Sequence, residues 1–296
     1  MSFKRYRQAS GYSETSIKVQ DSHVNQLLTW CITQSIDPEE ITYNQALQFI
    51  DHQRKRGIED QSIIRMINSI RIYYDYLVDT GAVTQNIIRR IRINQVGRKL
   101  LPQALPSEQL EKIYHDYTNL PEWHHRSERA RWLHQRNTVI LGFMVYQGLD
   151  SGQLARLETT HLNLAEGKIY ISSGRKSNAR ILNLQTVQLL PIKIYLDKTR
   201  VQLIVMQHED PGTLLFPVKK ASDMVSRIIR QVKRIDPELT DSRQIRASVI
   251  MNWLKQYNIR QVQYMVGHKS IRSTESYRVQ DLTDLTRQLE LFHPLR

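Results

Sequence analysis

Apolar residues in the first third of the chain recur every three or four positions, the spacing at which side chains share one face of an α-helix. Three successive groups carry this pattern: Val24, Leu27, Leu28 and Cys31, then Ala46, Leu47, Phe49 and Ile50, then Ile63, Ile67, Ile70, Tyr74 and Leu77. Gly81 follows the third group, where glycine can adopt the left-handed conformation that ends many helices. The pattern predicts three or four helices between residues 16 and 77.

A basic stretch separates this helical part from the rest of the chain. Residues 89–102 are rich in arginine, and Pro102 and Pro106 keep this region out of a helix because proline has no backbone N–H to donate. Ser107 can cap a new helix that continues through Leu110, Ile113 and Tyr114. Since 296 residues suffice for two cores, we predict a helical domain, a linker and a second domain over residues 1–88, 89–106 and 107–296.

The second domain is predicted to be mainly helical with one small β-hairpin. Helical spacing covers residues 136–157, 223–233, 245–253 and 259–266, and Gly267 ends the last helix. Ile169 and Ile171, then Leu182 and Leu184, alternate as residues of two short strands do. The turn between these strands carries Arg175 and Lys176. We therefore expect a mainly α, α+β fold with a basic hairpin tip.

The net charge favours a polyanionic partner. The formal charge is +13 and the pI is about 9.8, and the arginines cluster near aromatic residues, which favours nucleic acid over an indifferent basic surface. Solvated helix faces often carry such charges, so each basic residue alone is weak evidence. The predicted DNA-contacting residues of the first domain and the linker are Arg54, Lys55, Arg56, Arg65, Arg71, Arg89, Arg90, Arg92, Arg98 and Lys99.

Several classes of site are disfavoured. Cys31 is the single cysteine, so neither a disulfide framework nor a cysteine zinc site can form. His124, His125, His134 and His161 do not form an HExxH motif, and we predict no metal. The N-terminus lacks an apolar segment after its charges, and the longest apolar run, residues 139–146, is too short to span a bilayer. We expect a cytoplasmic protein without a membrane partner.

Two arginines, a histidine and a tyrosine follow one another near the C-terminus. Arg243 and Arg246 lie in Ser-Arg-Gln-Ile-Arg, His268 follows Gly267, and Tyr277 comes nine residues after the histidine. A guanidinium holds two phosphate oxygens at once, so Arg246 is a candidate phosphate clamp, with Arg243 on the same helical face. His268 can donate a hydrogen bond to that phosphate, and Tyr277 can attack phosphorus to form a phosphotyrosyl ester. This chemistry needs neither a metal nor a cofactor.

This order of residues, with Gly-His, a Ser/Thr-rich run and a late tyrosine, resembles the tyrosine recombinases, the integrase class of DNA strand-exchange enzymes. The resemblance implies a C-shaped clamp on double-stranded DNA, built from a SAM-like core-binding domain and an integrase-like catalytic domain. It implies DNA recombination or integration through a 3′-phosphotyrosyl intermediate on Tyr277, as mobile elements use. It places Arg246 at the family's second arginine and Arg243 where the His-x-x-Arg box usually has histidine. Lys176 would protonate the leaving 5′ oxygen, with Arg175 as the alternative occupant of that position.

The same resemblance assigns a role to the C-terminal tail. The segment from Leu282 to Leu291 has the pattern of a short amphipathic helix whose apolar side needs a partner. In the family such tails dock onto a neighbouring protomer, which implies a homo-oligomer on DNA, as a dimer or tetramer. The protein would then be associated with the nucleoid.

One position departs from the family pattern. Where the family has Gly-Leu-Arg-x-x-Glu-Leu, this chain reads Gly-Leu-Asp-Ser-Gly-Gln-Leu, with Asp150 at the place of the first catalytic arginine and Gln153 at that of the acid. A missing cationic donor should cost on the order of 10²–10³ in rate. Arg136 and Arg156 are candidate replacements, although on a continuous helix Arg156 would lie off the Asp150 face.

Two other functions stay open at this stage. An impaired relative of the recombinases could act as a DNA-binding accessory or regulatory protein, which Asp150 and Gln153 favour and the retained Arg246, His268 and Tyr277 disfavour. A helical nucleic-acid-binding module unrelated to recombinases would predict that replacing Tyr277 with phenylalanine changes nothing.

Overall fold

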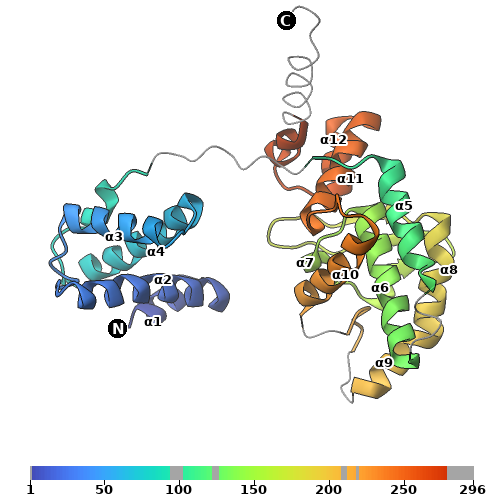
Figure 1. Cartoon of the computed structure of the whole chain (residues 1–296), viewed down its shortest axis with the longest axis horizontal. Coiled ribbons are helices and arrows are strands. Elements are labelled where there is room, and N and C mark those ends of the chain that lie inside the picture. The colour runs from blue at the N-terminus through green and yellow to red at the C-terminus, as the bar shows by residue number, and fades with distance from the viewer. Residues whose placement is uncertain (1, 94–102, 122–126, 208–211, 218–219, 279–296) are drawn as a thin grey trace, which may run out of the picture. The chain divides into compact units, whose positions relative to one another are not determined.

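The computed structural model describes residues 2–93, 103–121, 127–207, 212–217 and 220–278. The chain divides into two compact units, Met1–Lys99 and Leu100–Arg296, each with a core of its own (Figure 1). Within the described ranges, no helix combines the length and the apolar character that crossing a membrane requires.

The first unit is entirely helical in its described part. The helices are α1 Phe3–Ala9, α2 Glu14–Thr33, α3 Tyr43–Lys55 and α4 Asp60–Asp79, followed by the 3₁₀ helix η1 Ile87–Arg90. The hydroxyl of Ser13 caps α2, and Thr42 with Gln45 forms a reciprocal capping box at α3, so these helices begin where side chains can satisfy the first free N–H groups. Their apolar faces meet in one core, which confirms the predicted helices.

The described start of the expected linker belongs to this unit. Ile88 and Ile91 are buried in its core, and Arg71 of α4 donates hydrogen bonds to the carbonyl oxygens of both. Residues 89–93 therefore pack on the first unit, while Arg98 and Lys99 lie outside the described residues.

The second unit surrounds helix α6, Glu128–Gln147, which contacts α5, α8, α10 and α11 (Figure 1). Residues 137–145 of α6 are buried without interruption, because neighbouring helices cover it on several sides. The helices around it are α5 Ser107–Thr118, α8 Thr186–Ile194, the π-helix η4 Tyr195–Thr199, α9 Arg200–Gln207, α10 Ala221–Ile235, α11 Ser242–Gln256 and α12 Ile259–Val266. Residues 271–278 are also helical.

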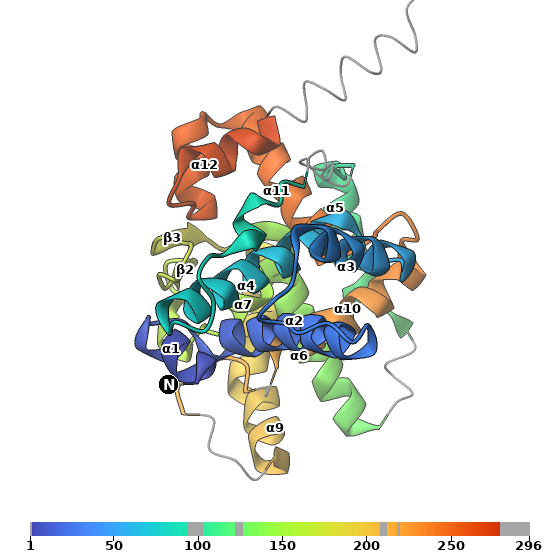
Figure 2. The same ribbon diagram turned by 90° about the vertical axis from the view of Figure 1, so that its left-hand side faces the viewer.

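A small antiparallel sheet lies in the same unit, and Figure 2 shows its strand β3 beside α12. Its strands, in the order β1-β2-β3, are Leu162–Asn163, Lys168–Ile171 and Arg180–Asn183. Ile169 pairs with Leu182 and Ile171 pairs with Arg180, and all four side chains are buried. The predicted hairpin is thus confirmed, whereas β1 and the 3₁₀ helix η3 Thr159–His161 before it were not predicted.

The predicted helix over residues 136–157 was wrong in its second half. Gly148 has a φ of +59°, the left-handed conformation that ends α6, and Leu149 then donates its N–H to the Phe143 carbonyl. A separate one-turn helix, α7 Ser151–Leu154, begins after Asp150. The predicted cap of α5 also differs, because Pro106 occupies the N-cap position and Ser107 is the first helical residue. The break at Gly148 decides the geometry of the site described next.

Candidate active site

A pocket of about 430 Å³ in the second unit gathers residues from four segments of the chain. The region of α7 contributes an acid, an amide and an arginine, the hairpin turn contributes two cations, α11 contributes one arginine, and the C-terminal segment contributes the histidine. The lining includes Asp150, Gln153, Arg156, Arg175, Lys176, Arg246, His268 and Ser273. Four residues predicted from the sequence, Arg246, His268, Lys176 and Arg175, therefore come together here.

Arg246 is fixed by oxygen atoms at the junction of α6 and α7. Its Nη1 donates hydrogen bonds to the Gly148 carbonyl and, at 3.0 Å, to Oε1 of Gln153. The Asp150 carboxylate lies 3.8 Å from the same nitrogen, and the Arg246 side chain is only 16% exposed. Such anchoring holds the guanidinium in one orientation while leaving other N–H groups for a ligand. The break at Gly148 supplies the carbonyl that makes this possible.

Asp150 and Gln153 form a reciprocal helix cap. Asp150 Oδ1 accepts the Gln153 N–H at 2.9 Å, and Gln153 Oε1 accepts the Asp150 N–H at 3.1 Å. The same Gln153 oxygen accepts from Arg246, so the amide both completes the cap and orients the arginine. Asp150 and Gln153 thus act together: one caps α7, and the other is a neutral acceptor for Arg246.

The Asp150 carboxylate should oppose a phosphate bound at Arg246. We expect Asp150→Asn to raise the rate of any phosphate chemistry in this pocket by about threefold to tenfold, because Asp150 lies 3.8 Å from the Arg246 nitrogen and removing a half-exposed charge beside the bound phosphate is worth roughly 1 kcal/mol in a water-like dielectric. Asparagine caps helices as well as aspartate, so α7 should persist. The measurement is the single-turnover rate of covalent DNA adduct formation. Asp241→Asn, a matched substitution at the N-cap of α11, should bring no gain; equal rates for Asp150→Asn and the parent would contradict the expectation.

His268 is held by the turn that ends α12. Gly267 adopts φ +79°, and the ring Nδ1 of His268 lies 3.0 Å from the buried hydroxyl of Thr274. Burial, then the nearby Arg246 and Arg180 guanidinium groups, lowers the pKa of His268 to about 4. The imidazole is therefore neutral at physiological pH, and the ring nitrogen not paired with Thr274 can take part in a hydrogen bond to a phosphate.

The lowered pKa of His268 should be visible in its pH titration. In an NMR titration, the ring resonances of His268 should titrate with a midpoint near pH 4, well below the ordinary value of about 6.5. Because folding favours the neutral ring, the unfolded chain binds the extra proton first, and the free energy of unfolding should fall as pH drops from about 6.5 towards 4. His268→Gln identifies the resonances by their loss and should remove that part of the pH dependence. A midpoint near 6.5 would show that the ring is solvated.

Tyr277 lies beside the pocket and packs against His268. The two rings are nearly parallel, 19° apart, with centroids separated by 6.1 Å. The Tyr277 side chain also packs on an apolar cluster formed by Ile250, Val262 and Val266. Burial raises the pKa of the Tyr277 hydroxyl, while Arg246 lowers it. The phenol is therefore protonated at rest, and a cation already lies near enough to favour its charged form.

Arg180 is a residue of this site that the sequence reasoning missed. It is 2% exposed, its Nε donates to the Met265 carbonyl at 2.6 Å, and its Nη1 and Nη2 have no hydrogen-bond partner in the described part of the chain. Burial and Arg246 lower the pKa of Arg180 to about 10. The signal was available: strand alternation from Leu182 places residue 180 on the same buried face.

The hairpin turn is attached to the histidine turn through main-chain contacts. Gly174 and Ser177 exchange hydrogen bonds across a two-residue turn formed by Arg175 and Lys176. Ser177 then forms a β-bridge with His268, and the Asn178 N–H donates to the Gly267 carbonyl at 2.8 Å. Both hairpin cations are consequently held at the rim of the pocket that contains Arg246.

Two predicted or considered cations lie elsewhere. The Arg243 side chain is 81% exposed, pairs with the N-cap residue Asp241 at 2.5 Å, and does not line the pocket. Arg136 is half-buried, donates to Asn137 and interacts electrostatically with Tyr117 and Tyr195. Arg136 therefore does not line the pocket that contains Arg246.

Several of the basic residues predicted to contact DNA have intramolecular partners in the first unit. Arg54 pairs with Asp60, Lys55 with Asp51 and Arg89 with Asp75, while Arg71 donates to backbone carbonyls. Arg90 lies over the Tyr43 ring, Arg65 is exposed, and Arg92 lines a pocket beside α4. A side chain that already has such a partner must share or exchange it to bind a phosphate.

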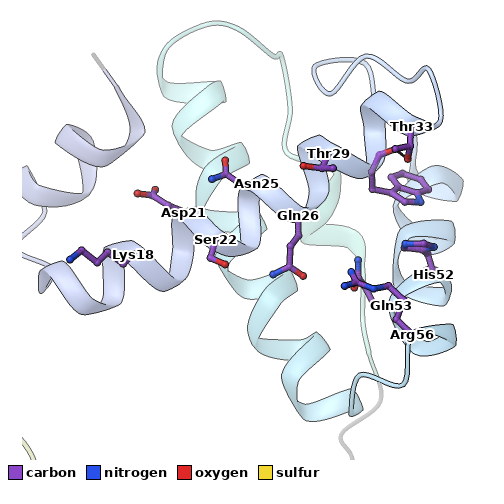
Figure 3. A pocket seen from close by; sticks show the side chains of 11 residues that line it. Lys18, Asp21, Ser22, Asn25, Gln26, Thr29, Thr33, His52, Gln53 and Arg56 are labelled. Atoms are coloured by element: carbon purple, nitrogen blue, oxygen red, sulfur yellow. Dashed lines mark hydrogen bonds between the residues drawn. The ribbon is translucent and has the colours of Figure 1, made fainter. Parts of the chain in front are cut away.

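Arg56 lines a polar groove between α2 and α3. Figure 3 shows the side chains that α2 and α3 direct towards this groove of about 700 Å³, among them Lys18, Ser22, Asn25, Gln26 and His52. The groove is rich in amide, hydroxyl and cationic groups. No cluster of three or more potential metal-binding side chains occurs within the described ranges, and His124, His125 and the tail from Leu282 to Leu291 lie outside them.

Comparison with known proteins identifies the family. The sequence pattern of the phage integrase family matches residues 103–283, more than half of the chain. The chain is 23% identical over 296 residues to the tyrosine recombinase XerD of Listeria innocua, covering 96% of this chain and 94% of that protein. It is 24% identical over 301 residues to the tyrosine recombinase XerC of Actinobacillus succinogenes, with 97% and 93% covered.

The fold agrees with this match. A lambda integrase fragment, solved as a dimer bound to a COC′ core site, superposes with a TM-score of 0.62 at 15% identity, covering 93% of this chain and 92% of that one. The likeness extends the family's fold beyond the matched residues, to nearly the whole chain. The chain therefore belongs to the phage integrase family of tyrosine recombinases.

Proposed function

We propose that the protein is a site-specific DNA recombinase that cleaves and rejoins DNA strands through a 3′-phosphotyrosyl bond to Tyr277. The observation that carries this proposal is the convergence of Arg246, His268 and the hairpin cations on one pocket, with Tyr277 stacked on the His268 ring. The tyrosine recombinases to which the chain is similar over almost its whole length support it.

Each group then has a chemical role in one displacement at phosphorus. The Tyr277 oxygen attacks the scissile phosphate, the phenol proton passes to solvent as the new P–O bond forms, and the P–O5′ bond breaks. Arg246 neutralises charge on the non-bridging oxygens, and neutral His268 donates a hydrogen bond to them from the ring nitrogen that does not face Thr274. The ester conserves the bond energy, so a 5′ hydroxyl can reverse the step and rejoin the strand without ATP.

Lys176 is the group we assign to the leaving 5′ oxygen. Both Lys176 and Arg175 line the pocket at the two-residue turn of the hairpin. A lysine ammonium gives up a proton far more readily than a guanidinium, which stays protonated in proteins. Arg175 then holds a neighbouring backbone phosphate. Arg243, exposed at the start of α11, contributes charge from outside the pocket.

The first domain, residues 1–88, would bind the duplex. The groove between α2 and α3 supports this, because amide and basic side chains such as Asn25, Gln26 and Arg56 are those that hydrogen-bond base edges and phosphates (Figure 3). The linker, residues 89–106, would follow the phosphate backbone with its arginines. A DNA substrate of this kind keeps the protein with the nucleoid in the cytoplasm.

Assembly on DNA would use the C-terminal tail. A groove of about 630 Å³ is lined by aromatic and apolar side chains, including Ile181, Trp253, Tyr257 and Tyr264, together with polar ones such as Gln185 and Gln261. Ile181 and Tyr264 are more than half exposed, which is unusual for large apolar side chains without a partner. The tail of a second copy, with Leu282, Leu285 and Leu289, has the amphipathic pattern that would fill it. The lambda integrase relative was solved as a dimer on its core site.

The proposal is tested by trapping the covalent intermediate. A duplex from DNA flanking the protein's own gene carries a nick just 3′ of each candidate phosphate, so that cleavage releases a short fragment and the adduct accumulates. The adduct is separated on a denaturing gel, and peptide mass mapping identifies the residue that carries the DNA. An adduct on Tyr277 supports the recombinase. An adduct on another residue, or none despite sequence-specific binding, would refute it.

The accessory-protein alternative retains one specific observation in its favour, the Asp150 carboxylate 3.8 Å from Arg246. Sequence-specific binding without an adduct would select this alternative, in which the pocket no longer performs chemistry.

A further inference from the structure

We propose that Arg156 supplies the second guanidinium of the phosphate clamp, in the place that the family gives to the arginine missing at Asp150. This inference rests on the proposed recombinase function for its chemical meaning. It starts from the lining of the pocket, where Arg156 lies together with Arg246, Lys176 and His268.

The backbone explains how Arg156 reaches the pocket. Helix α7 is a single turn that ends at Leu154, with Ala155 as its C-cap. Arg156 therefore lies beyond the helix, and helical spacing does not determine where its side chain points. The side chain turns back, and its Nη1 donates to the Gly152 carbonyl at 2.7 Å. On one continuous helix through residue 157, Arg156 would lie off the face that carries Asp150. The chain instead forms two separate helices, because α6 ends at Gln147 and α7 ends at Leu154.

One glycine leaves room for this guanidinium in its observed position. A Cβ atom at Gly174 would lie 2.7 Å from Nη2 of Arg156 and 3.2 Å from its Cζ, so a side chain at this position would force the guanidinium to move. Gly174 does not have a positive φ, so its backbone conformation does not require glycine. The guanidinium therefore lies between the Gly152 carbonyl, to which it donates, and the hairpin turn.

Arg156 forms no ion pair with a described carboxylate, and its hydrogen bond goes to the neutral Gly152 carbonyl. Asp150 is the single described carboxylate that lines the pocket, and the cations Arg156, Arg175, Lys176 and Arg246 outnumber it. Arg156 and Arg246 both disfavour the charged form of Arg180, so the two guanidinium groups act on the same small region. The excess positive charge favours a bound anion, and a scissile phosphate with two non-bridging oxygens offers one oxygen to each guanidinium.

The test compares Arg156→Ala with Arg156→Lys and with Arg131→Ala, a matched loss of an exposed arginine near the start of α6. Each variant reacts with a nicked duplex carrying either a normal scissile phosphodiester or a methylphosphonate, in which a methyl group replaces one non-bridging oxygen and removes the charge. On the phosphodiester, Arg156→Ala should slow adduct formation by about 100-fold. Arg156→Lys should slow it less, because lysine keeps the positive charge but lacks the planar set of N–H donors of a guanidinium. On the methylphosphonate the loss should shrink to a few-fold.

A second readout does not depend on chemistry. Each phosphate contact adds about 0.9 to the slope of log affinity against log salt concentration, so Arg156→Ala should lower that slope by about one contact in fluorescence anisotropy while Arg131→Ala leaves it unchanged. An adduct on Tyr277 with wild-type rate and slope in Arg156→Ala would overturn the Arg156 role and leave the recombinase intact. An equal loss on both substrates would also overturn it. No adduct in the parent protein, with a lowered slope in Arg156→Ala, would instead refute the recombinase and retain Arg156 as a phosphate contact.

Discussion

Tyr277→Phe should abolish every covalent protein–DNA adduct while changing DNA affinity by less than about twofold. The substitution removes the only oxygen of this side chain, and with it the nucleophile that the phosphotyrosyl bond requires. Phenylalanine keeps the ring that stacks on His268 and packs against Ile250, Val262 and Val266. The folded structure and the phosphate clamp should therefore persist, and the loss should be confined to chemistry.

Tyr170→Phe is the matched control for this experiment. Tyr170 lies on β2 in the same unit, is 41% exposed and packs against the His161 ring, and it lines neither the pocket nor the apolar groove. The control should form adducts at nearly the parent rate. Adducts that survive in Tyr277→Phe would show that another residue is the nucleophile. An equal loss of adducts in both variants would indicate a general defect in folding or binding.

The helices of the first unit were predictable because their apolar residues keep one register over many turns. The groups ending at Cys31, Ile50 and Leu77 each supply buried residues to one core, although Leu47 of the second group is 40% exposed. The hairpin was predictable for the same reason, since Ile169, Ile171 and Leu182 alternate and are buried. The break at Gly148 was not, because apolar residues on both sides of it, up to Leu157, continue a helical pattern across a residue that helices tolerate.

The candidate site was predictable only for residues whose spacing in the sequence forms a recognisable motif. Arg246, His268 and Tyr277 keep a spacing that the fold converts into proximity, and two of them line the pocket together. The contribution of Arg156 depends on where a one-turn helix ends, and that of Arg180 on its packing below Gly267. Arg243 shows the converse: it lies three residues from Arg246, yet the N-cap carboxylate of Asp241 binds it at the surface.

The Asp150 and Gln153 pair connects the start of α7 to the arginine of the pocket. The reciprocal cap begins α7 immediately after α6 ends, and the Gln153 oxygen holds Arg246 as a carboxylate would, with less charge to oppose a phosphate. The positive charge of the pocket then depends on Arg246, the hairpin cations and Arg156. This distribution makes Arg246 the residue whose removal should cost most among the cations.

Arg246→Ala should slow adduct formation by on the order of 10³, measured as the single-turnover rate on a nicked duplex. The loss exceeds that expected for one neutral donor for two reasons. A full charge is removed next to the developing charge at phosphorus, and Asp150 loses the cation 3.8 Å away that offsets its own charge. Arg246→Lys keeps the positive charge but cannot make bidentate hydrogen bonds to two phosphate oxygens. Its rate should therefore remain well below that of the parent.

Stability and charge can be separated in the same variants. The Arg246 guanidinium bonds the Gly148 carbonyl and Gln153, so Arg246→Ala should also lower the free energy of unfolding, by roughly 1–3 kcal/mol for hydrogen bonds to a charged group. A methylphosphonate at the scissile position should restore much of the lost rate if the role of Arg246 is charge neutralisation, since the neutral linkage needs less of it. Arg131→Ala should show neither defect. A rate loss in Arg246→Ala that the neutral substrate leaves untouched, in a protein that is folded under assay conditions, would mean that Arg246 only supports α7 and that the phosphate lies elsewhere.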